Sequence, residues 1–320
     1  MTMATPVTIC EVGPRDGLQM AQGRMATDVK LRWIRQLAAA GLKEIEVGSF
    51  VSARMIPQMA DTGDVVRAAV GIDGLTVCAL ACNLRGVIAA HEAGAHVVSI
   101  PISVSDTHSH ANVGKGTDDQ VEMVRSIVDW VRAQERPMRI DAAAATAFGC
   151  SMEGDVPRQR VAQVAAALAA TGVDRIALAD TVGYAHPALV HDTVREVQDA
   201  IGSRLTKLHL HDTMGLGLAN ALAGLEEGIR EFDSCLAGLG GCPFAPGASG
   251  NIVTEDLVFM LESMGHRTGI ELPALLAARA LLREALPEEP MRSGVAAAGI
   301  PRTFHPQGVQ STKAPSVSSH

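Results

Sequence analysis

The sequence predicts an α/β protein of the (β/α)8 TIM barrel class. Short runs rich in β-branched residues alternate with longer Ala- and Leu-rich stretches, and the alternation recurs about every 30 residues. Eight such units fit into about 260 residues, which matches a barrel better than a doubly wound sheet. The sequence also contains neither GxGxxG nor GxxxxGK[ST], the phosphate-binding turns that often open doubly wound domains.

Each expected element follows from a local pattern. The eight predicted strands are apolar or β-branched runs at residues 7–12, 44–48, 75–80, 96–101, 139–146, 175–180, 206–212 and 231–236. Helical spacing of apolar residues predicts helices at residues 28–40, 121–132, 158–170, 187–201 and 218–227. Several helical patterns end at a glycine, which readily adopts the left-handed backbone of a helix C-terminus: Gly41, Gly94, Gly172 and Gly228.

The chain continues beyond the eighth unit. Residues 272–286 predict one extra C-terminal helix, whereas residues 287–320 are rich in Pro, Ser and Gly and show no apolar periodicity. We therefore expect a barrel domain over residues 1–286 and a flexible, mobile tail over residues 287–320. The tail is either a loose extension or an active-site lid or oligomer arm.

Composition excludes several classes of protein. With 47% hydrophobic and 19% charged residues, this chain of 320 residues is not a disordered segment. A net charge of −8 without a long Lys/Arg run argues against nucleic acid or a membrane as the main partner. We find no apolar stretch of membrane-spanning length, no signal peptide and no CxxC pair, which predicts a cytoplasmic protein with reduced thiols. A small-molecule ligand is then the default.

In a TIM barrel, the reacting groups lie at the C-terminal ends of the strands and in the loops that follow. The first predicted strand runs into Arg15 and Asp16, which by themselves could form a simple loop salt bridge. The seventh contains His209 and His211. Because side chains alternate along a strand, both imidazoles face the same side and can bind one ion. This pair predicts a metal site at the barrel mouth.

The loop after the eighth strand supplies further groups. Asn251, at its end, adds an amide oxygen to Asp16 and the two imidazoles, and this mixed O/N set suits Mg²⁺ or Mn²⁺ better than structural zinc. Two positions then remain for a substrate with a hydroxyl and a carbonyl oxygen, as in a 3-hydroxyacyl thioester. Cys242 in the same loop is either a proton donor or acceptor or a small apolar filler, and the other five cysteines are expected in the core.

At these motifs, the sequence resembles the 3-hydroxy-3-methylglutaryl-CoA lyase family, in a superfamily that also contains isopropylmalate and homocitrate synthases. The resemblance covers roughly residues 7 to 265. It rests on EVGPRDGLQ (11–19), IEVGSFVS (45–52), PQMAD (57–61), NLRG (83–86), ADTVG (179–183), HLHDT (209–213) and GLGGCPFAPGASGN (238–251). The last motif is the most specific and favours cleavage over condensation, because the synthases typically lack its Gly-Cys-Pro cluster.

The resemblance implies a metal-dependent retro-Claisen cleavage of an acyl-CoA thioester, 3-hydroxy-3-methylglutaryl-CoA, to acetoacetate and acetyl-CoA, in a homodimer. It implies the metal ligands Asp16, His209, His211 and Asn251. It implies the catalytic residues Arg15 at the thioester oxygen, Glu46 as a supporting carboxylate, and His209 and Cys242 for proton transfer. The predicted substrate contacts are Arg15, Gln19, Ser49, Ser105, His108 and Thr181.

Two stretches depart from the family pattern. Met20 and Ala21 stand where Asn-Glu usually follows, and residues 103–112 read SVSDTHSHAN in place of Ala-Ser-Glu and a later Lys-Asn pair. The second stretch borders the acyl pocket, so citramalyl-CoA is an alternative substrate. His108 and His110 are either substrate contacts or part of an exposed polar loop. A Claisen-type synthase and a catalytically silent acyl-CoA-binding protein are the alternatives from other classes.

Overall fold

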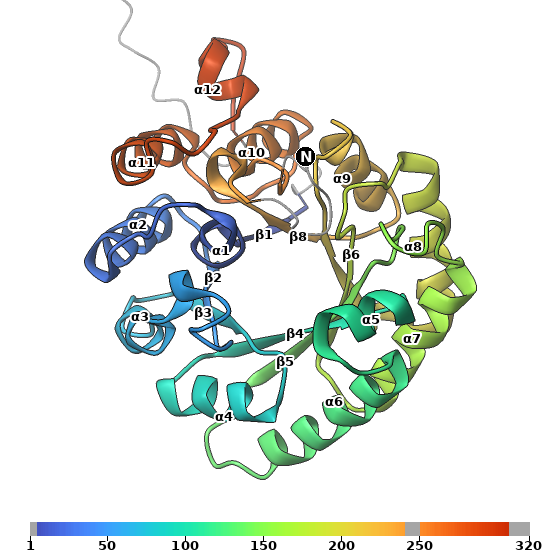
Figure 1. Cartoon of the computed structure of the whole chain (residues 1–320). Helices are drawn as coiled ribbons and strands as arrows, with labels where there is room; N and C mark the ends of the chain where they lie inside the picture. Colours follow the sequence, from blue (N-terminus) through green and yellow to red (C-terminus); the bar gives the residue numbers. More distant parts are fainter. Residues whose placement is uncertain (1–4, 241–249, 307–320) are drawn as a thin grey trace, which may run out of the picture.

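Eight parallel strands close into a barrel in the computed structural model, which describes residues 5–240 and 250–306 (Figure 1). The strands pair in chain order and β1 pairs with β8, so the sheet has no free edge. They are β1 (Thr8–Glu11), β2 (Glu44–Ser49), β3 (Thr76–Leu80), β4 (Val97–Ser103), β5 (Arg139–Ala145), β6 (Arg175–Ala179), β7 (Leu205–His209) and β8 (Glu231–Ser234). Each predicted strand overlaps an observed one, which confirms the (β/α)8 barrel.

Helices surround the barrel (Figure 1). The longer ones are α2 (Thr27–Ala39), α3 (Thr62–Ala69), α4 (Leu84–Ala93), α5 (Asp106–Val113), α6 (Thr117–Arg132), α7 (Arg158–Ala170), α8 (Pro187–Ile201), α9 (Gly217–Glu226), α10 (Thr254–Ser263) and α11 (Leu272–Ala285). The predicted bounds of α7 and α8 match, whereas α3, α4, α5 and α10 have no counterpart among the predicted ranges. No helix in the described ranges is both long and apolar enough to cross a membrane.

Short helical turns lie in the connecting loops. They are η1 (Gly13–Gly17), α1 (Leu18–Met20), η2 (Pro57–Met59), η3 (Gly202–Arg204), η4 (Leu236–Gly238) and α12 (Gly294–Ala298). The turn η1 directly follows β1 and is a single turn of π-helix, a form that often occurs at functional sites.

The helices cover the barrel with apolar faces. In α2, for example, Trp33, Ile34 and Leu37 are fully buried, and their spacing places them on one side of the helix. Burial of each such side chain contributes about 1.5 to 3 kcal/mol. The scaffold that holds the strand ends is therefore a close-packed apolar layer.

The described part of the predicted tail, residues 287–306, contacts helix α10. The expected flexibility of residues 287–320 stays a prediction. The side chain of Asp256 in α10 accepts hydrogen bonds from Ser293 Oγ (2.7 Å) and from the backbone of Gly294 and Val295 (2.9 Å each). Phe304 packs on Phe259, with 5.2 Å between ring centroids. These contacts arise without any helical periodicity in the segment, so periodicity alone could not predict them.

Candidate active site

The first segment of the site is positioned by Glu11, the last residue of β1. Its buried carboxylate accepts hydrogen bonds from the backbone of Gly13 (3.0 Å) and Leu236 (2.8 Å) and from Thr254 Oγ1 (2.6 Å). These contacts tie η1 to the end of β8 and to the start of α10. Because η1 carries Arg15 and Asp16, Glu11 fixes these two side chains at the barrel mouth.

Arg15 lies between two carboxylates. Its Nη1 donates to Asp16 Oδ1 at 2.5 Å, and its Nε donates to Glu46 on β2. Burial opposes ionisation of Asp16, but the charge of Arg15, a hydrogen bond from His211 and the neighbouring imidazoles outweigh it and lower the pKa of Asp16. Burial raises the pKa of Glu46, although Arg15 counteracts this shift. Asp16 is therefore held as a carboxylate.

The two histidines approach each other at the end of β7. His209 is the last residue of the strand, and His211 lies two residues beyond it in a backbone bridge with Asn251. Their Nε2 atoms are 3.1 Å apart, and Asp16 Oδ2 is 3.9 Å from His209 Nε2 and 3.7 Å from His211 Nε2. Asn251 Nδ2 donates to the same Asp16 oxygen at 2.6 Å. The four predicted metal ligands therefore converge.

The approach of Asn251 depends on two glycines with positive φ. A Cβ on Gly250 would lie 2.4 Å from the carbonyl oxygen of Gly240, and a Cβ on Gly240 would lie 3.1 Å from Asn251 Nδ2. Only a residue without a side chain fits such close backbone contact. The glycines of the predicted loop thus have a direct structural function at both of its described ends.

The donor set fits a divalent cation. Ligand atoms of Asp16, His209 and His211 all lie within 4.8 Å of one another. Asn251 Oδ1 is buried and has no hydrogen-bond partner among the described residues. A buried carbonyl oxygen without a partner is costly, and an amide oxygen is a good ligand for Mg²⁺ or Mn²⁺. One carboxylate and two imidazoles thus cluster at the barrel mouth, and the amide group of Asn251 contacts the same carboxylate.

Sequence reasoning missed Asp233, which contacts His209. Asp233 on β8 is the register partner of His209 on β7, and its Oδ2 lies 3.2 Å from His209 Nδ1. Burial lowers the pKa of His209, but the hydrogen bond and charge of Asp233 and the charge of Asp16 outweigh burial and raise it. The alternation of Glu231, Phe232 and Asp233 along an interior strand was the available signal.

The predicted substrate contacts fall into two groups. Ser49, at the end of β2, is buried, and its Oγ has no hydrogen-bond partner among the described residues, which leaves it available to a ligand. Gln19 and Thr181 are half-buried. Thr181 Oγ1 and Ser105 Oγ instead accept backbone hydrogen bonds, from Thr146 at 2.8 Å and from His108 at 3.1 Å.

The stretch that departs from the family pattern forms helix α5. Ser105 caps this helix, and His108 in its first turn is only 3% exposed, with Nδ1 2.8 Å from Ser103 Oγ. The side chain of His110 is 57% exposed. The alternative of an exposed polar loop is therefore wrong for His108, because its ring packs inward beside the end of β4.

The cysteines divide in the same way as predicted, where they are described. Cys10, Cys78, Cys150 and Cys235 are buried and Cys82 is half-buried, in agreement with a core role. Cys242 lies outside the described residues, and its assignment stays a prediction from the sequence.

A second group of metal-ligating side chains lies deeper in the barrel. Atoms of Cys10, Glu44 and Cys78 also come within 4.8 Å of one another. Lys207 Nζ, however, donates to Glu44 Oε1 at 3.0 Å, so a cation of the protein already neutralises this carboxylate. Burial also raises the pKa of the Cys78 thiol, which opposes formation of a thiolate ligand. This group is better explained as part of the core.

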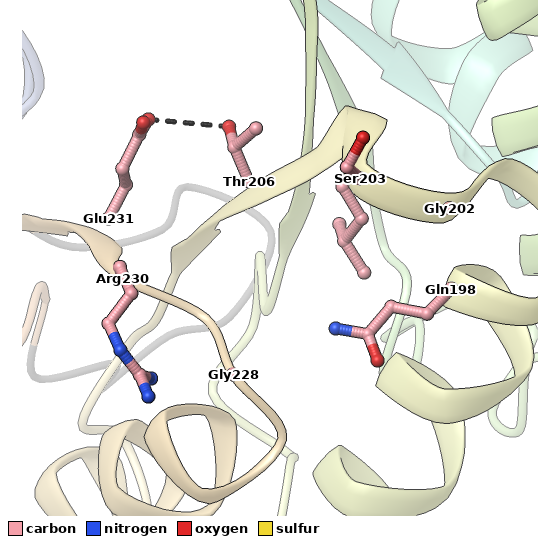
Figure 2. A pocket seen from close by; sticks show the side chains of 8 residues that line it. Gln198, Gly202, Ser203, Thr206, Gly228, Arg230 and Glu231 are labelled. Atoms are coloured by element: carbon pink, nitrogen blue, oxygen red, sulfur yellow. Dashed lines mark hydrogen bonds between the residues drawn. The ribbon is translucent and has the colours of Figure 1, made fainter.

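A cavity of about 380 Å³ lies at the opposite end of the barrel, around the starts of β7 and β8 (Figure 2). Four of the polar side chains that line it already form hydrogen bonds within the protein. Gln198 donates to the backbone of Glu227, Arg230 donates to two backbone carbonyls, and Glu231 accepts from Thr206. This cavity therefore differs from the site at the C-terminal ends of the strands, where polar groups without hydrogen-bond partners among the described residues lie close together.

Comparisons with known proteins show which family this chain belongs to. A family model described as HMGL-like matches residues 6–282. The hydroxymethylglutaryl-CoA lyase YngG of Bacillus subtilis is 41% identical over 281 residues, which span 87% of this chain and 92% of that protein. A crystal structure of the HMG-CoA lyase of the same species superposes with a TM-score of 0.88 at 38% identity, over 93% of this chain and 99% of that one.

A second solved structure carries ligands. It is an HMG-CoA lyase from Acinetobacter baumannii in complex with coenzyme A and 3-methylmalate. This chain resembles it with a TM-score of 0.87 and 39% identity, over 94% of this chain and 97% of the other.

Proposed function

The chain belongs to the HMGL-like family, and from this premise we propose that it is a carbon–carbon lyase that cleaves 3-hydroxy-3-methylglutaryl-CoA to acetoacetate and acetyl-CoA. The observation that carries the proposal is the convergence of Asp16, His209, His211 and Asn251 at the barrel mouth, in the loops where TIM barrels place their chemistry. Named lyases that match most of the chain support the same reaction.

We propose that these four side chains hold Mg²⁺ or Mn²⁺. When bound there, the cation would acidify the substrate hydroxyl and stabilise negative charge on the thioester oxygen. Asp16 would supply the single negative charge of the set, and Arg15 keeps it ionised. Among the four, His209 is the ligand whose ring a carboxylate orients, through Asp233.

Arg15 is the proposed electrostatic partner of the reacting thioester. Its guanidinium is held by Glu46 and Asp16, so its position is fixed before the substrate binds. A preorganised cation stabilises charge that develops on the thioester oxygen without further reorganisation. Ser49 is the proposed polar contact on the neighbouring strand, because its buried Oγ has no partner among the described residues. His209 and Cys242 remain our proposed residues for proton transfer.

The proposal is tested by incubating the enzyme with 3-hydroxy-3-methylglutaryl-CoA and Mn²⁺ and measuring acetoacetate and acetyl-CoA by chromatography. We expect equimolar products, and we expect EDTA to abolish them. Citramalyl-CoA is assayed in parallel, because helix α5 borders the expected acyl pocket and differs from the family pattern. Faster turnover of citramalyl-CoA would replace the named substrate while it kept the reaction class.

A condensation assay separates the lyase from a synthase. Acetyl-CoA is offered together with a 2-oxoacid, and free CoA thiol is measured. Thiol release without cleavage of either thioester would contradict the proposed lyase activity.

A further inference from the structure

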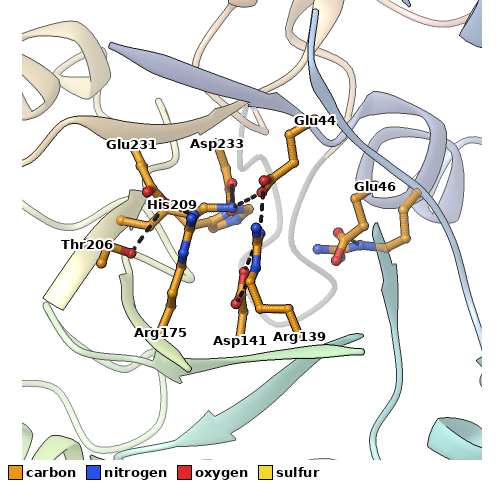
Figure 3. A network of polar contacts seen from close by, with 11 residues as sticks. Glu44, Glu46, Arg139, Asp141, Arg175, Thr206, His209, Glu231 and Asp233 are labelled. Atoms are coloured by element: carbon orange, nitrogen blue, oxygen red, sulfur yellow. Dashed lines mark hydrogen bonds and ion pairs between the residues drawn. The ribbon is translucent and has the colours of Figure 1, made fainter. Parts of the chain in front are cut away.

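Three charged side chains form a column beneath His209 inside the barrel. Asp233 lies between the imidazole and a lysine, with Oδ2 3.2 Å from His209 Nδ1 and Oδ1 3.1 Å from Lys207 Nζ. Lys207 in turn donates to Glu44 Oε1 at 3.0 Å. Figure 3 shows Asp233 beside His209, with Glu44 in the same network of polar contacts. Lys207 and His209 are two residues apart on β7, so both point into the barrel.

We propose that Lys207 and Asp233 are positioning residues that together fix the tautomer and the ring orientation of His209. The inference rests on the proposed metal site. A carboxylate can only accept a hydrogen bond, so His209 Nδ1 must carry the proton. In the neutral ring, Nε2 then keeps a free lone pair, and this is the atom that faces Asp16 and His211.

The second imidazole lacks such a partner. His211 Nδ1 is buried without a hydrogen-bond partner among the described residues, whereas His209 Nδ1 has a carboxylate held in place from below. The column therefore acts on one of the two histidines. The contact of Asp233 is made to His209 Nδ1, while His209 Nε2 faces Asp16 and His211. This arrangement favours a positioning role over a purely structural ion pair.

Lys207 gives this column a direction, because an ammonium group can only donate hydrogen bonds. In the variant Asp233→Asn, the ammonium must face the amide oxygen, since the amide NH₂ would place donor against donor. The NH₂ group then faces His209 Nδ1 and shifts the ring proton to Nε2, the atom that should bind metal. Removal of Lys207 from this variant frees the amide to turn its oxygen back toward His209.

The test compares Asp233→Asn, Lys207→Met and the double variant with the wild type. The tautomer of His209 is read in the metal-free protein by long-range ¹H–¹⁵N NMR, with His209→Gln to assign the signal. Mn²⁺ affinity is measured by calorimetry. We expect Asp233→Asn to carry the proton on Nε2 and to bind Mn²⁺ 10- to 100-fold more weakly, the range typical for loss of such a partner.

The double variant decides between positioning and mere structure. We expect it to regain the Nδ1-protonated ring and to bind Mn²⁺ more tightly than Asp233→Asn does. A structural role predicts the reverse, since two disrupted partners should be worse than one. Arg175→Met is the matched control. Arg175 pairs with Glu231 at 2.7 Å in the same interior network, and neither contacts His209, so affinity and tautomer should stay at wild-type values.

The outcomes are distinguishable from failure of the proposed function. A wild type that binds no Mn²⁺ would refute the metal site itself. Wild-type binding with an unchanged tautomer in Asp233→Asn, or with no recovery in the double variant, would overturn the positioning role alone. Lys207→Gln replaces Lys207→Met if the latter does not fold, because its amide can accept as well as donate and allows the same recovery.

Discussion

Polar side chains lie at both ends of the barrel interior, but they are paired with each other at one end and incompletely paired at the other. Toward the N-terminal ends of the strands, charges alternate and are paired: Arg139 donates to Glu44 (2.8 Å) and to both oxygens of Asp141 (2.9 Å each), and Lys207 donates to Glu44 (Figure 3). Toward the C-terminal ends, two imidazole nitrogens lie 3.1 Å apart, and the buried amide oxygen of Asn251 has no partner among the described residues.

We call the polar side chains toward the N-terminal ends of the strands the lower layer and those toward the C-terminal ends the upper layer. Side chains alternate along the strands in the same way in both layers, so strand geometry does not explain why only the lower layer is fully paired. In the lower layer, each of these charges has an oppositely charged partner within the protein, and these ion pairs stabilise the folded state. The upper layer instead leaves the Asn251 amide oxygen and His211 Nδ1 buried without a partner among the described residues, which is costly. We therefore expect changes in the upper layer to affect activity and changes at Arg139 or Glu44 in the lower layer to affect folding. Lys207 contacts both layers, through Glu44 and Asp233.

The sharpest test of this contrast is Asp16→Ala in the upper layer. Loss of the only carboxylate among the proposed ligands should reduce kcat/KM about a thousandfold, equivalent to about 4 kcal/mol. Asp64→Ala is the control, because Asp64 also pairs with an arginine at 2.6 Å but lies on the surface. Steady-state kinetics and thermal melting are measured together. Unchanged turnover in Asp16→Ala would refute the ligand assignment.

Arg139→Met tests the lower layer. The substitution leaves Asp141 without its ion-pair partner and Glu44 with Lys207 only, so we expect unfolding to become easier by about 3 kcal/mol. Mn²⁺ affinity should remain near that of the wild type. Urea denaturation and calorimetry measure the two quantities. A large loss of metal affinity with intact stability would show that the two layers are not separable.

Metal removal gives a smaller effect on stability. A ligand that binds only the folded state at thirty times its Kd stabilises it by about 2 kcal/mol. The thermal midpoint of the wild type should therefore rise when Mn²⁺ replaces EDTA. Asp16→Ala should show no such rise, whereas Arg139→Met should show the full one. Equal midpoints for the wild type under both conditions would argue against a metal at the upper layer.

The sequence predicts the barrel, and it names four side chains that the structure brings together, because both depend on local patterns. Strand alternation places His209 and His211 on one side, and the barrel rule places Asp16 and Asn251 beside them. The exact strand end differs, since β7 stops at His209 and His211 is held by a bridge to Asn251. The side-chain direction survives because the backbone remains extended.

Long-range partners are what sequence reasoning misses. Asp233 and Lys207 meet only because β7 and β8 are adjacent in a particular register, which no local pattern encodes. Residues 106–113 contain few apolar side chains, so nothing in their spacing announces helix α5 or the burial of His108. The contacts of residues 293–295 depend in the same way on Asp256, a residue distant in the sequence.

The last prediction concerns acid. Burial opposes ionisation of Glu44, but the charges of Lys207 and Arg139 outweigh it and lower its pKa from 4.5 to about 2. Between these values the unfolded chain takes up a proton that the folded one does not. The contribution of Glu44 is therefore complete above pH 4.5 and is lost as the pH falls toward 2, at up to about 1.4 kcal/mol per pH unit.

Glu44→Gln removes this dependence. At pH 6 the variant should be less stable than the wild type, and the difference should narrow as urea denaturation, with EDTA present, is repeated at lower pH. Parallel curves for the two proteins would mean that Glu44 keeps an ordinary pKa. In that case, the lower layer would not be the strongly paired counterpart of the metal site that its distances indicate.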